Sequence, residues 1–385
     1  MHEKITVAVI GMGGYGINYV KAILNKGDAL GTECLAMVDI RPEACPLYPQ
    51  VQAMGIPVYS DITELYENHR PQLVLIATPI QFHCHQACYA MERGSHVLCE
   101  KPAAATLEQV RTMAAVSRRT GRFLGIGFQR CFCEAVLKAK ADVLAGKYGK
   151  LSWAKAGIIM RRGLDYYARG WAGRIRSGDS FIYDSVANNS AAHYLQNMLF
   201  LAGDRLNTSA RIGSVEAELY RVNDIENFDT ISANVTTGDG AELFFVSTHA
   251  ADGDFEFHSE FSYEQGRILF DAREEVWGEL ADGTRIHYGS CLEDASRKLW
   301  CALEAVRGED TLYCDIGTAT PHTAFIQHIQ DRVPIQDIQH LAKLRDNAFP
   351  GAPGPAWQKY IPGMTEAVKA SYENRIMLSK SLFGR

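Results

Sequence analysis

No stretch of the sequence is apolar for long enough to cross a lipid bilayer. The most continuous apolar run is Leu73–Ile80, whereas a membrane-spanning helix needs about 20 apolar residues. Residues 1–4 lead directly into a strand-like run, so we identify no secretory signal. We also identify no internal repeat and no low-complexity tract. These absences predict a cytoplasmic protein that does not bind membranes.

Positively charged residues are fewer than negatively charged ones. The sequence has 39 Lys and Arg residues and 45 Asp and Glu residues, so its net charge is −6. General nucleic-acid binders usually carry the opposite sign, so we expect no nucleic-acid partner. The 10 cysteines are scattered through predicted strands and helices without framework spacing. This scatter predicts reduced thiols. Small-molecule chemistry is therefore favoured.

The overall composition is that of a globular protein. Hydrophobic residues make up 47% and charged residues 22% of 385 residues, both near the globular average. At about 150 residues per domain, the length predicts two domains. A chain of this size builds a large core, so its folding requires neither a disulfide nor a metal.

The first third of the chain alternates between short apolar strands and helices. The predicted strands are Ile5–Ile10, Cys34–Asp39, Val58–Tyr59, Leu73–Thr78, His96–Glu100 and Phe123–Gly127. Such alternation is typical of βαβ units and a parallel sheet with helices on both faces. We therefore predict an α/β fold with a doubly wound domain at residues 1–128.

The pattern changes after about residue 150. The predicted strands there are 151–161, 211–222, 229–237, 241–250 and 255–263, with helices at 188–202 and from 365 onward. Strict period-two alternation at 255–263 is typical of an open antiparallel sheet. We therefore predict a second, α+β domain at residues 129–385, with a loop at 350–363 and a final helix that packs back on the first domain.

A glycine-rich loop follows the first strand and opens a helix. Gly11 permits the tight turn, Gly13 lets backbone approach a pyrophosphate, and Gly16 allows close helix–strand packing. Asp39 ends the second strand 23 residues after Gly16, where an acid binds the ribose hydroxyls of NAD. Arg41 could meet a 2′-phosphate, so NADP remains the alternative cofactor. The predicted contacts also include Met12, Gly14, Tyr15 and Ile40.

Several motifs then follow in order over residues 5–205. They are Gly11–Gly16, Ala77–Pro79 with His83 behind it, Cys99–Pro102, Gly127–Arg130, Asn189–His193 and Leu201–Gly203. In these motifs the sequence resembles the glucose–fructose oxidoreductase / inositol dehydrogenase / MocA-like family of NAD(P)-dependent oxidoreductases. The resemblance implies a Rossmann domain followed by an α+β domain with a large open sheet. It also implies cofactor contacts at Thr78, Pro79, His83, Glu100, Lys101 and Gln129.

The same resemblance implies hydride transfer between nicotinamide and a sugar or cyclitol hydroxyl. Lys101 lies at the carboxyl end of a strand, where ligands of such sheets bind, and its charge would stabilise a developing alkoxide. His193 can exchange a proton near neutral pH. We predict that His193 removes the hydroxyl proton while Lys101 stabilises the oxygen.

The segment around His193 departs from the family pattern. Many members have Asp-x-Gly-x-His, whereas this chain has Asn189 and Ala191 at the first two motif positions. Asn189 cannot act as a base, although it can hold a sugar hydroxyl and, at i, i+4 from His193, would share a helix face with it. Asp184, about one turn earlier, could supply the missing carboxylate.

A loop rich in arginine and aromatic residues precedes these candidates. Aromatic faces pack against sugar C–H groups and arginines donate to hydroxyls or acidic groups. We predict Tyr167, Arg169 and Trp171 as substrate contacts. We predict no metal site, because the adjacent His83 and Cys84 point apart on a helix and zinc needs about four convergent ligands.

Two other functions stay open. One is cleavage of a glycoside through transient oxidation by a tightly held NAD, and the other is a sugar- or NAD-sensing protein without turnover. We also expect a homodimer or homotetramer that pairs through the second domain. Its open sheet would otherwise expose apolar side chains such as Phe244 or Val246 to water. In a monomer, residues 350–385 would cover that face instead.

Overall fold

The computed structural model describes residues 4–292, 295–309, 311–346 and 357–384. Its residues form two compact units. Unit 1 comprises Met1–Phe132 and Asp294–Thr320, and unit 2 comprises Cys133–Glu293 and Pro321–Arg385.

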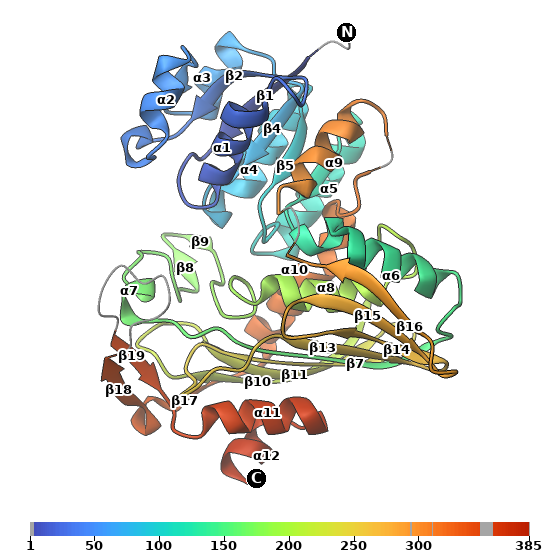
Figure 1. Ribbon diagram of the computed structural model, residues 1–385. Coiled ribbons are helices and arrows are strands. Elements are labelled where there is room, and N and C mark those ends of the chain that lie inside the picture. The colour runs from blue at the N-terminus through green and yellow to red at the C-terminus, as the bar shows by residue number, and fades with distance from the viewer. Residues whose placement is uncertain (1–3, 293–294, 310, 347–356, 385) are drawn as a thin grey trace. The chain divides into compact units, whose positions relative to one another are not determined.

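Unit 1 is built on a six-stranded sheet (Figure 1). Its strands are β1 (Ile5–Ile10), β2 (Thr32–Val38), β3 (Val58–Tyr59), β4 (Leu73–Ile76), β5 (His96–Cys99) and β6 (Leu124–Ile126). Their spatial order is β3-β2-β1-β4-β5-β6, and every neighbouring pair is parallel. This is the doubly wound order that brings ligands to the carboxyl ends of the strands, so the predicted α/β fold is confirmed.

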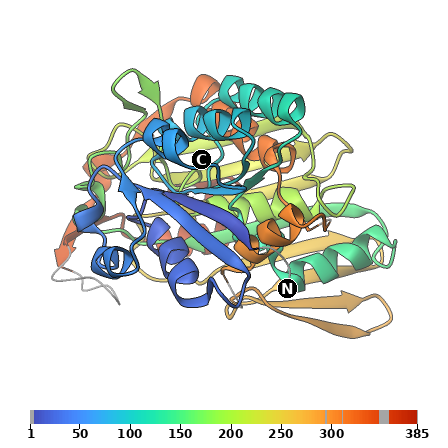
Figure 2. The same ribbon diagram turned by 90° about the horizontal axis from the view of Figure 1, so that it is seen from above.

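Helices connect these strands. They are α1 (Gly16–Lys26), α2 (Tyr48–Ala53), α3 (Ile62–Asn68), α4 (Ile80–Glu92) and α5 (Leu107–Thr120), with the 3-10 turn η1 (Pro42–Ala44). The helices α4 and α5 lie side by side (Figure 2). A capping box between Thr106 and Gln109 begins α5, and Gly121 in the left-handed conformation ends it.

A later segment of the chain returns to unit 1. It carries α9 (Arg297–Val306), whose Leu299 and Leu303 join the same hydrophobic cluster as Val9 and Leu75. The structure thus differs from a division at residues 128/129, which assigns this whole segment to the second domain. Hydrophobic spacing predicts that a segment is buried, but it does not say which core the segment joins.

Unit 2 is built on a nine-stranded sheet. Its strands are β7 (Leu151–Ile159), β10 (Ile212–Arg221), β11 (Thr230–Thr237), β12 (Glu242–Thr248), β13 (His258–Tyr263), β14 (Gly266–Phe270), β15 (Glu275–Leu280), β16 (Arg285–Ser290) and β17 (Ile335–Asp337). Their order is β16-β15-β14-β13-β7-β12-β11-β10-β17. Only β7/β12 and β10/β17 are parallel among these pairs, which confirms the predicted mostly antiparallel sheet.

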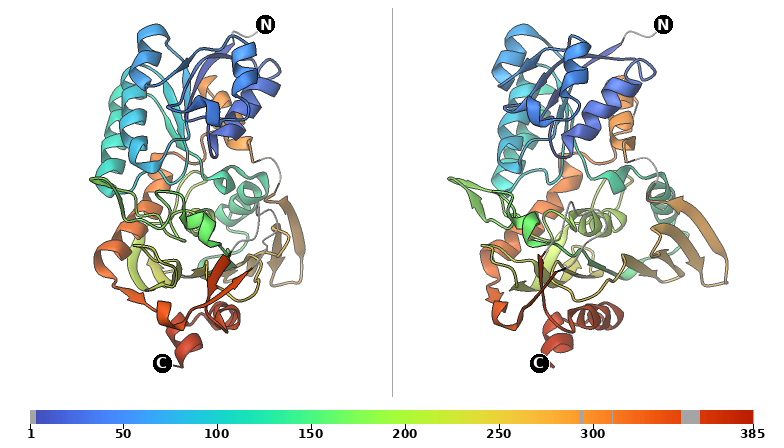
Figure 3. Two further views of the ribbon diagram at one scale, coloured as in Figure 1. Left: turned by 90° about the vertical axis from the view of Figure 1, so that its left-hand side faces the viewer. Right: turned by 60° about the vertical axis from the view of Figure 1, so that its left-hand side comes forward.

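Helices pack on both faces of this sheet (Figures 1 and 3). On one face lie α6 (Glu134–Leu144), against β15 and β16, and α8 (Ala192–Leu201), against β7. On the other lie α11 (Met364–Asn374) and α12 (Leu378–Phe383), with α11 against β7 and β12.

The final helices correct two expectations. Phe244 and Val246, expected to be exposed, are 2% and 0% exposed and cluster with Met364 and Val368 of α11. The final helix therefore packs on the sheet of its own unit, whereas it was expected on the first domain. The apolar stripe of this helix indicated that one of its faces is buried, but it did not indicate which surface covers that face.

The remaining elements of the described chain are short, apart from α10 (Ile316–Arg332), which runs across the division between the units. They are η2 (Gln129–Phe132), α7 (Leu164–Tyr167), η3 (Gln339–Leu341) and two hairpins, β8 (Arg176–Ser177) with β9 (Ser180–Phe181) and β18 (Lys343–Asp346) with β19 (Trp357–Tyr360). Of the loop predicted at 350–363, residues 350–356 lie outside the described residues, and β19 occupies 357–360. All ten cysteines are thiols. Within the described ranges, no helix has the length and apolarity that a membrane span requires.

Candidate functional site

The carboxyl edge of the unit 1 sheet gathers the residues predicted to bind a dinucleotide. The strands β1, β2, β4, β5 and β6 are parallel, so the segments that follow them lie at one edge. These segments are Gly11–Gly16, Asp39–Arg41, Thr78–Pro79, Glu100–Lys101 and Gln129. The predicted cofactor residues therefore share one edge of one domain.

The three glycines of the motif are needed for different physical reasons. Gly11 has φ +86°, and a Cβ there would lie 2.8 Å from the Ala77 carbonyl oxygen. A Cβ on Gly16 would lie 2.0 Å from the Gly11 carbonyl oxygen. A Cβ on Gly13 would meet nothing within 4 Å. Gly11 and Gly16 are thus required by the turn itself, whereas Gly13 keeps a face of the loop open, which fits the close approach of a pyrophosphate.

Asp39 lies against this loop. Its Oδ2 accepts a hydrogen bond from the Met12 backbone N–H at 2.7 Å, and its Oδ1 accepts one from the Arg41 N–H at 2.9 Å. These bonds fix the carboxylate beside the loop, where the ribose of a dinucleotide would lie. Ile40 between them is 79% exposed.

The Glu-Lys-Pro turn after β5 rests on a buried ion pair. Glu100 Oε1 accepts hydrogen bonds from the Lys298 ammonium and from the Tyr19 hydroxyl, the latter at 2.6 Å. Lys298 comes from α9 and also donates to the Gly127 carbonyl at 3.2 Å. Burial and the Glu100 charge raise the pKa of Tyr19 well above its ordinary value. The peptide bond between Lys101 and Pro102 is cis.

His83 joins two of the turns. Its Nε2 lies 2.8 Å from the Thr78 carbonyl oxygen, and its Nδ1 lies 3.0 Å from the Pro102 carbonyl oxygen. Burial lowers its pKa, and a neutral imidazole donates to one of these two carbonyl oxygens while packing against the other. Its contacts favour a role in bracing the turns at Thr78 and Pro102 over direct contact with a cofactor.

In unit 2, Asn189 lies in the turn before α8, because that helix begins only at Ala192. The expectation that Asn189 and His193 share a helix face is therefore wrong, and only His193 lies within α8. The Asn189 side-chain amide donates to Asp184 Oδ1 at 2.8 Å and to the Tyr166 hydroxyl at 3.1 Å. Asp184 Oδ2 accepts a hydrogen bond from the Gly173 N–H at 2.6 Å. The chain thus keeps a carboxylate one hydrogen bond away from Asn189.

A second chain of hydrogen bonds adjoins this cluster. The Tyr167 hydroxyl lies 2.7 Å from His249 Nδ1, and the Ser190 hydroxyl lies 2.5 Å from His249 Nε2. Burial, and then the charges of Arg162 and Arg169, hold the pKa of His249 well below its ordinary value. A neutral imidazole can accept from one hydroxyl while it donates to the other. Neither His249 nor Ser190 was among the predicted site residues.

The arginine- and aromatic-rich loop joins the same cluster through Tyr166, another residue not predicted. The Arg169 guanidinium lies 3.8 Å from the centroid of the Tyr166 ring and 5.0 Å from that of Trp171. Of the three predicted substrate contacts, Tyr167 and Arg169 thus contact Tyr166 beside Asn189, whereas Trp171 contacts Arg169.

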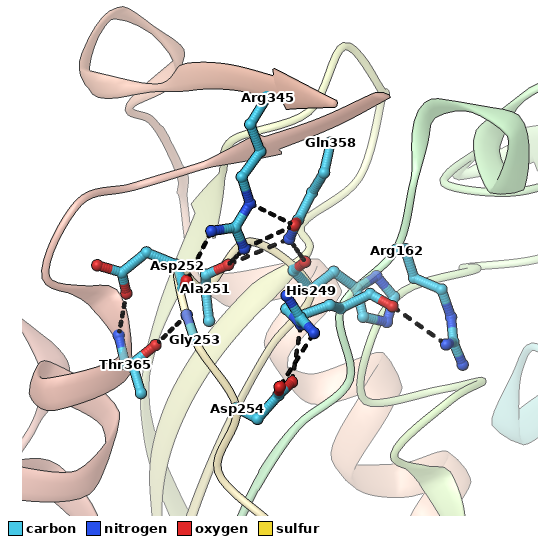
Figure 4. Close-up of polar contacts among 10 residues, drawn as sticks. Arg162, His249, Ala251, Asp252, Gly253, Asp254, Arg345, Gln358 and Thr365 are labelled. Atoms are coloured by element: carbon cyan, nitrogen blue, oxygen red, sulfur yellow. Dashed lines mark hydrogen bonds and ion pairs between the residues drawn. The ribbon is translucent and has the colours of Figure 1, made fainter. Parts of the chain in front are cut away.

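The hairpin β18–β19 braces the backbone that carries His249 (Figure 4). Gln358 Nε2 donates to the His249 carbonyl at 3.4 Å and to the Ala251 carbonyl at 3.1 Å. Arg345 Nη1 donates to the Asp252 carbonyl at 2.7 Å. Next to it, the Asp252 carboxylate accepts from the Thr365 N–H at 3.0 Å. These bonds hold the chain after β12 in place.

The described part of the chain contains no group of three His, Cys, Asp or Glu residues arranged to hold a metal ion. The candidate site therefore consists of two sets of side chains. Unit 1 carries the glycine loop, Asp39 and Lys101. Unit 2 carries Asp184, Asn189, His193 and the loop around Tyr166.

Comparison with known proteins agrees with this geometry. Residues 5–128 match the sequence model of the oxidoreductase family with an NAD-binding Rossmann fold, GFO_IDH_MocA. The chain is 32% identical over 161 residues to 1-carboxy-3-chloro-3,4-dihydroxycyclo hexa-1,5-diene dehydrogenase of Comamonas testosteroni, covering 42% of this chain and 39% of that protein. It is 25% identical over 208 residues to inositol 2-dehydrogenase of Corynebacterium glutamicum, covering 54% and 56%. The chain thus matches less than two thirds of either relative.

The fold extends further than the sequence similarity. The WlbA dehydrogenase from Bordetella pertussis, solved in complex with NADH and UDP-GlcNAcA, superposes with a TM-score of 0.70 at 22% identity, over 86% of this chain and 96% of that one. At this identity the likeness shows a common fold. The resemblance inferred from the motifs is confirmed, because residues 5–128 match the model of the GFO_IDH_MocA oxidoreductase family with its NAD-binding Rossmann fold.

Proposed function

We propose that the protein is an NAD-dependent oxidoreductase that transfers a hydride between nicotinamide and a hydroxyl of a sugar, sugar derivative or cyclitol. The observation that carries this proposal is the gathering of the glycine loop, Asp39 and Glu100–Lys101 at one edge of a doubly wound sheet. Relatives named as inositol and cyclohexadiene-diol dehydrogenases support the substrate class. Residues 1–128 would bind the dinucleotide, and residues 129–385 would supply the substrate contacts and the oligomer interface. The scattered cysteines favour a cytoplasmic location.

The chemistry follows from a few side chains. Bound NAD would supply the hydride acceptor. His193 would take the hydroxyl proton, and the Lys101 ammonium would stabilise negative charge on the same oxygen. Asp184 accepts a hydrogen bond from the Asn189 NH₂ group. The amide oxygen of Asn189 therefore points away from Asp184 and would accept a hydrogen bond from a substrate hydroxyl.

The test is reduction of NAD⁺, followed by absorbance at 340 nm, with a panel of sugars, sugar acids and cyclitols. Appearance of NADH with one member of the panel supports the proposal. Cleavage of glycosides without net NADH would indicate the redox-neutral reaction instead. Tight NADH binding without turnover of any compound would indicate a sensor.

We expect the protein to bind NADH more tightly than NADPH. The Asp39 carboxylate is fixed beside the glycine loop by two backbone hydrogen bonds, and it would repel a 2′-phosphate. The opposing charge is Arg41. Fluorescence titration with both cofactors measures the preference, and Asp39→Ala should reduce it. Tighter binding of NADPH by the unmodified protein would contradict the role of Asp39.

We also expect a homodimer or homotetramer, through a different surface from Phe244 and Val246. One cross-strand row continues the face that α11 covers: Lys155, Glu260, Leu269, Trp277 and His287. Trp277 stacks on His287 with ring centroids 4.3 Å apart, and both remain partly accessible. Large aromatic side chains bordered by charges are typical of protein interfaces.

Light scattering at micromolar concentration tests this expectation. Trp277→Glu should shift the mass toward the monomer. Met54→Glu, at an exposed position of unit 1, should leave the mass unchanged. A mass near 42.7 kDa for the unmodified protein would contradict the proposed assembly.

A further inference from the structure

We infer that the substrate carries an anionic group, a carboxylate or a phosphate ester, and that Arg162 binds it. The inference rests on the proposed function for the place of the substrate, and it adds the substrate's charge. It comes from the different surroundings of two neighbouring arginines.

Arg161 is neutralised within the fold. Its Nε lies 2.8 Å from Asp254 Oδ1, and its Nη2 donates to Asp254 Oδ2 at 3.0 Å. This is the two-pronged geometry in which a guanidinium satisfies a carboxylate.

Arg162 is in no ion pair with any described carboxylate. Its Nη1 donates to the Arg161 carbonyl at 3.3 Å, and its side chain also hydrogen-bonds the Tyr166 hydroxyl, but its Nε is buried without a hydrogen-bond partner. In Figure 4 the Arg162 side chain points away from Asp254. A buried donor that makes no hydrogen bond is costly, and a bound anion would remove that cost.

The position of Arg162 connects it to the candidate substrate residues. Its guanidinium lies 5.0 Å from the centroid of the Tyr166 ring, whose other cationic neighbour is Arg169 at 3.8 Å. The Tyr166 hydroxyl accepts from Asn189. Tyr166 therefore contacts both Arg162 and the Asn189 amide, which we propose binds a substrate hydroxyl.

The cluster holds two guanidinium groups that form no ion pair within the described chain. Two guanidinium groups, Arg162 and Arg169, share the Tyr166 ring, and no described carboxylate forms an ion pair with either. Asp184 lies nearby and keeps its negative charge, because the Gly173 N–H and the Asn189 amide that donate to it are neutral. The charges of both arginines also help to keep His249 neutral. A guanidinium that has no described carboxylate partner and a buried, unsatisfied Nε favours an anionic ligand over a neutral one.

The ligand class follows from guanidinium chemistry. The planar fork of arginine matches the two oxygens of a carboxylate or a phosphate, whereas a neutral hydroxyl offers one acceptor and no charge. Acidic sugars or cyclitols, or their phosphate esters, fit this site better than their neutral counterparts.

The experiment is calorimetric titration of the NADH-loaded protein, in which no hydride can leave the sugar. The probes are stereochemically matched: D-glucose, D-glucuronate and D-glucose 6-phosphate, and the same three forms of D-galactose. We expect at least one acidic form to bind tenfold or more tightly than its neutral counterpart. The uronate and phosphate arms show which anion the site prefers.

Arg162→Met should weaken binding of that acid by about 10- to 100-fold, in the range of charge-assisted hydrogen bonds. It should change binding of the neutral sugar by less than threefold. Arg161→Met is the matched control, because Arg161 is already paired, and it should leave both affinities within threefold. Arg162→Lys, which keeps the charge, should restore part of the acid's affinity if Arg162→Met is poorly folded.

Equal binding of neutral and acidic forms would overturn the inference. An equal loss of both in Arg162→Met would also overturn it and assign Arg162 to stacking on Tyr166 alone. Failure of every acid to bind at millimolar concentration would overturn it as well. Selective acid binding without NAD⁺ reduction by any sugar would instead support the inference and count against the proposed dehydrogenase activity.

Discussion

Replacing Lys101 by alanine should lower kcat by about 10² or more, because a positioned charge on the reacting oxygen contributes at least that factor. NADH affinity should stay within a few-fold of the parent. Lys101 follows β5 at the ligand-binding edge of the sheet. The neighbouring Glu100 accepts from Lys298 and Tyr19, so this carboxylate has a cationic partner of its own from α9.

His193→Ala should show the same pattern, with the loss in kcat and not in NADH binding. Steady-state kinetics on the substrate found in the panel and NADH titration separate the two effects. Lys147→Ala is the matched control, since Lys147 pairs with Asp142 on the surface of unit 2. Wild-type turnover by both Lys101→Ala and His193→Ala would show that the proposed catalytic centre is wrong.

The dinucleotide-binding half could be predicted from the sequence because its signals are local. Each strand is a short apolar run followed within three residues by a glycine, a proline or an acid, and the Gly11–Gly16 loop constrains its own geometry. The mixed sheet of unit 2 was harder to predict from the sequence. Its strands β14 and β15 place the apolar side chains Leu269 and Trp277 on a partly accessible face, so polar and apolar residues do not alternate clearly in the sequence.

The substrate side was predicted only in part, for two reasons. Asn188, Asn189 and Ser190 favour turns over helix interiors, and this local signal could have placed the start of α8 correctly. His249 carried no such signal, since it is a single histidine after an apolar strand. His249 follows β12, and the loop with Tyr167 follows β7. His249 meets Tyr167 and Ser190 because β12 pairs with β7.

The pair of Lys298 and Glu100 is the clearest case of a contact that no local pattern could predict. The two residues are 198 positions apart, and α9 had not been assigned to unit 1. Both side chains are buried, with 0% of Lys298 and 7% of Glu100 exposed. The Lys298 ammonium also lies 4.0 Å from the centroid of the Tyr15 ring in the glycine loop. One cation thus holds both the Glu-Lys-Pro turn and the loop that would receive the pyrophosphate.

Lys298→Met should therefore lower the free energy of unfolding by about 3–5 kcal/mol, the usual cost of leaving one charge of a buried pair without its partner. Urea unfolding measures this loss. The double variant Lys298→Met/Glu100→Gln should recover a substantial part of it, because no buried charge remains. A loss below about 1 kcal/mol in the single variant, as for an exposed ion pair, would contradict a stabilising role.

NADH binding separates this role from a purely structural one. Because Lys298 also contacts Tyr15, both the single and the double variant should bind NADH more weakly than the parent. The control is Lys140→Met, which removes a buried ammonium of unit 2 that donates to the Thr208 carbonyl at 2.6 Å. It should cost stability but leave NADH affinity unchanged. If the double variant regained full NADH affinity together with its stability, Lys298 would support the fold of unit 1 without positioning the glycine loop.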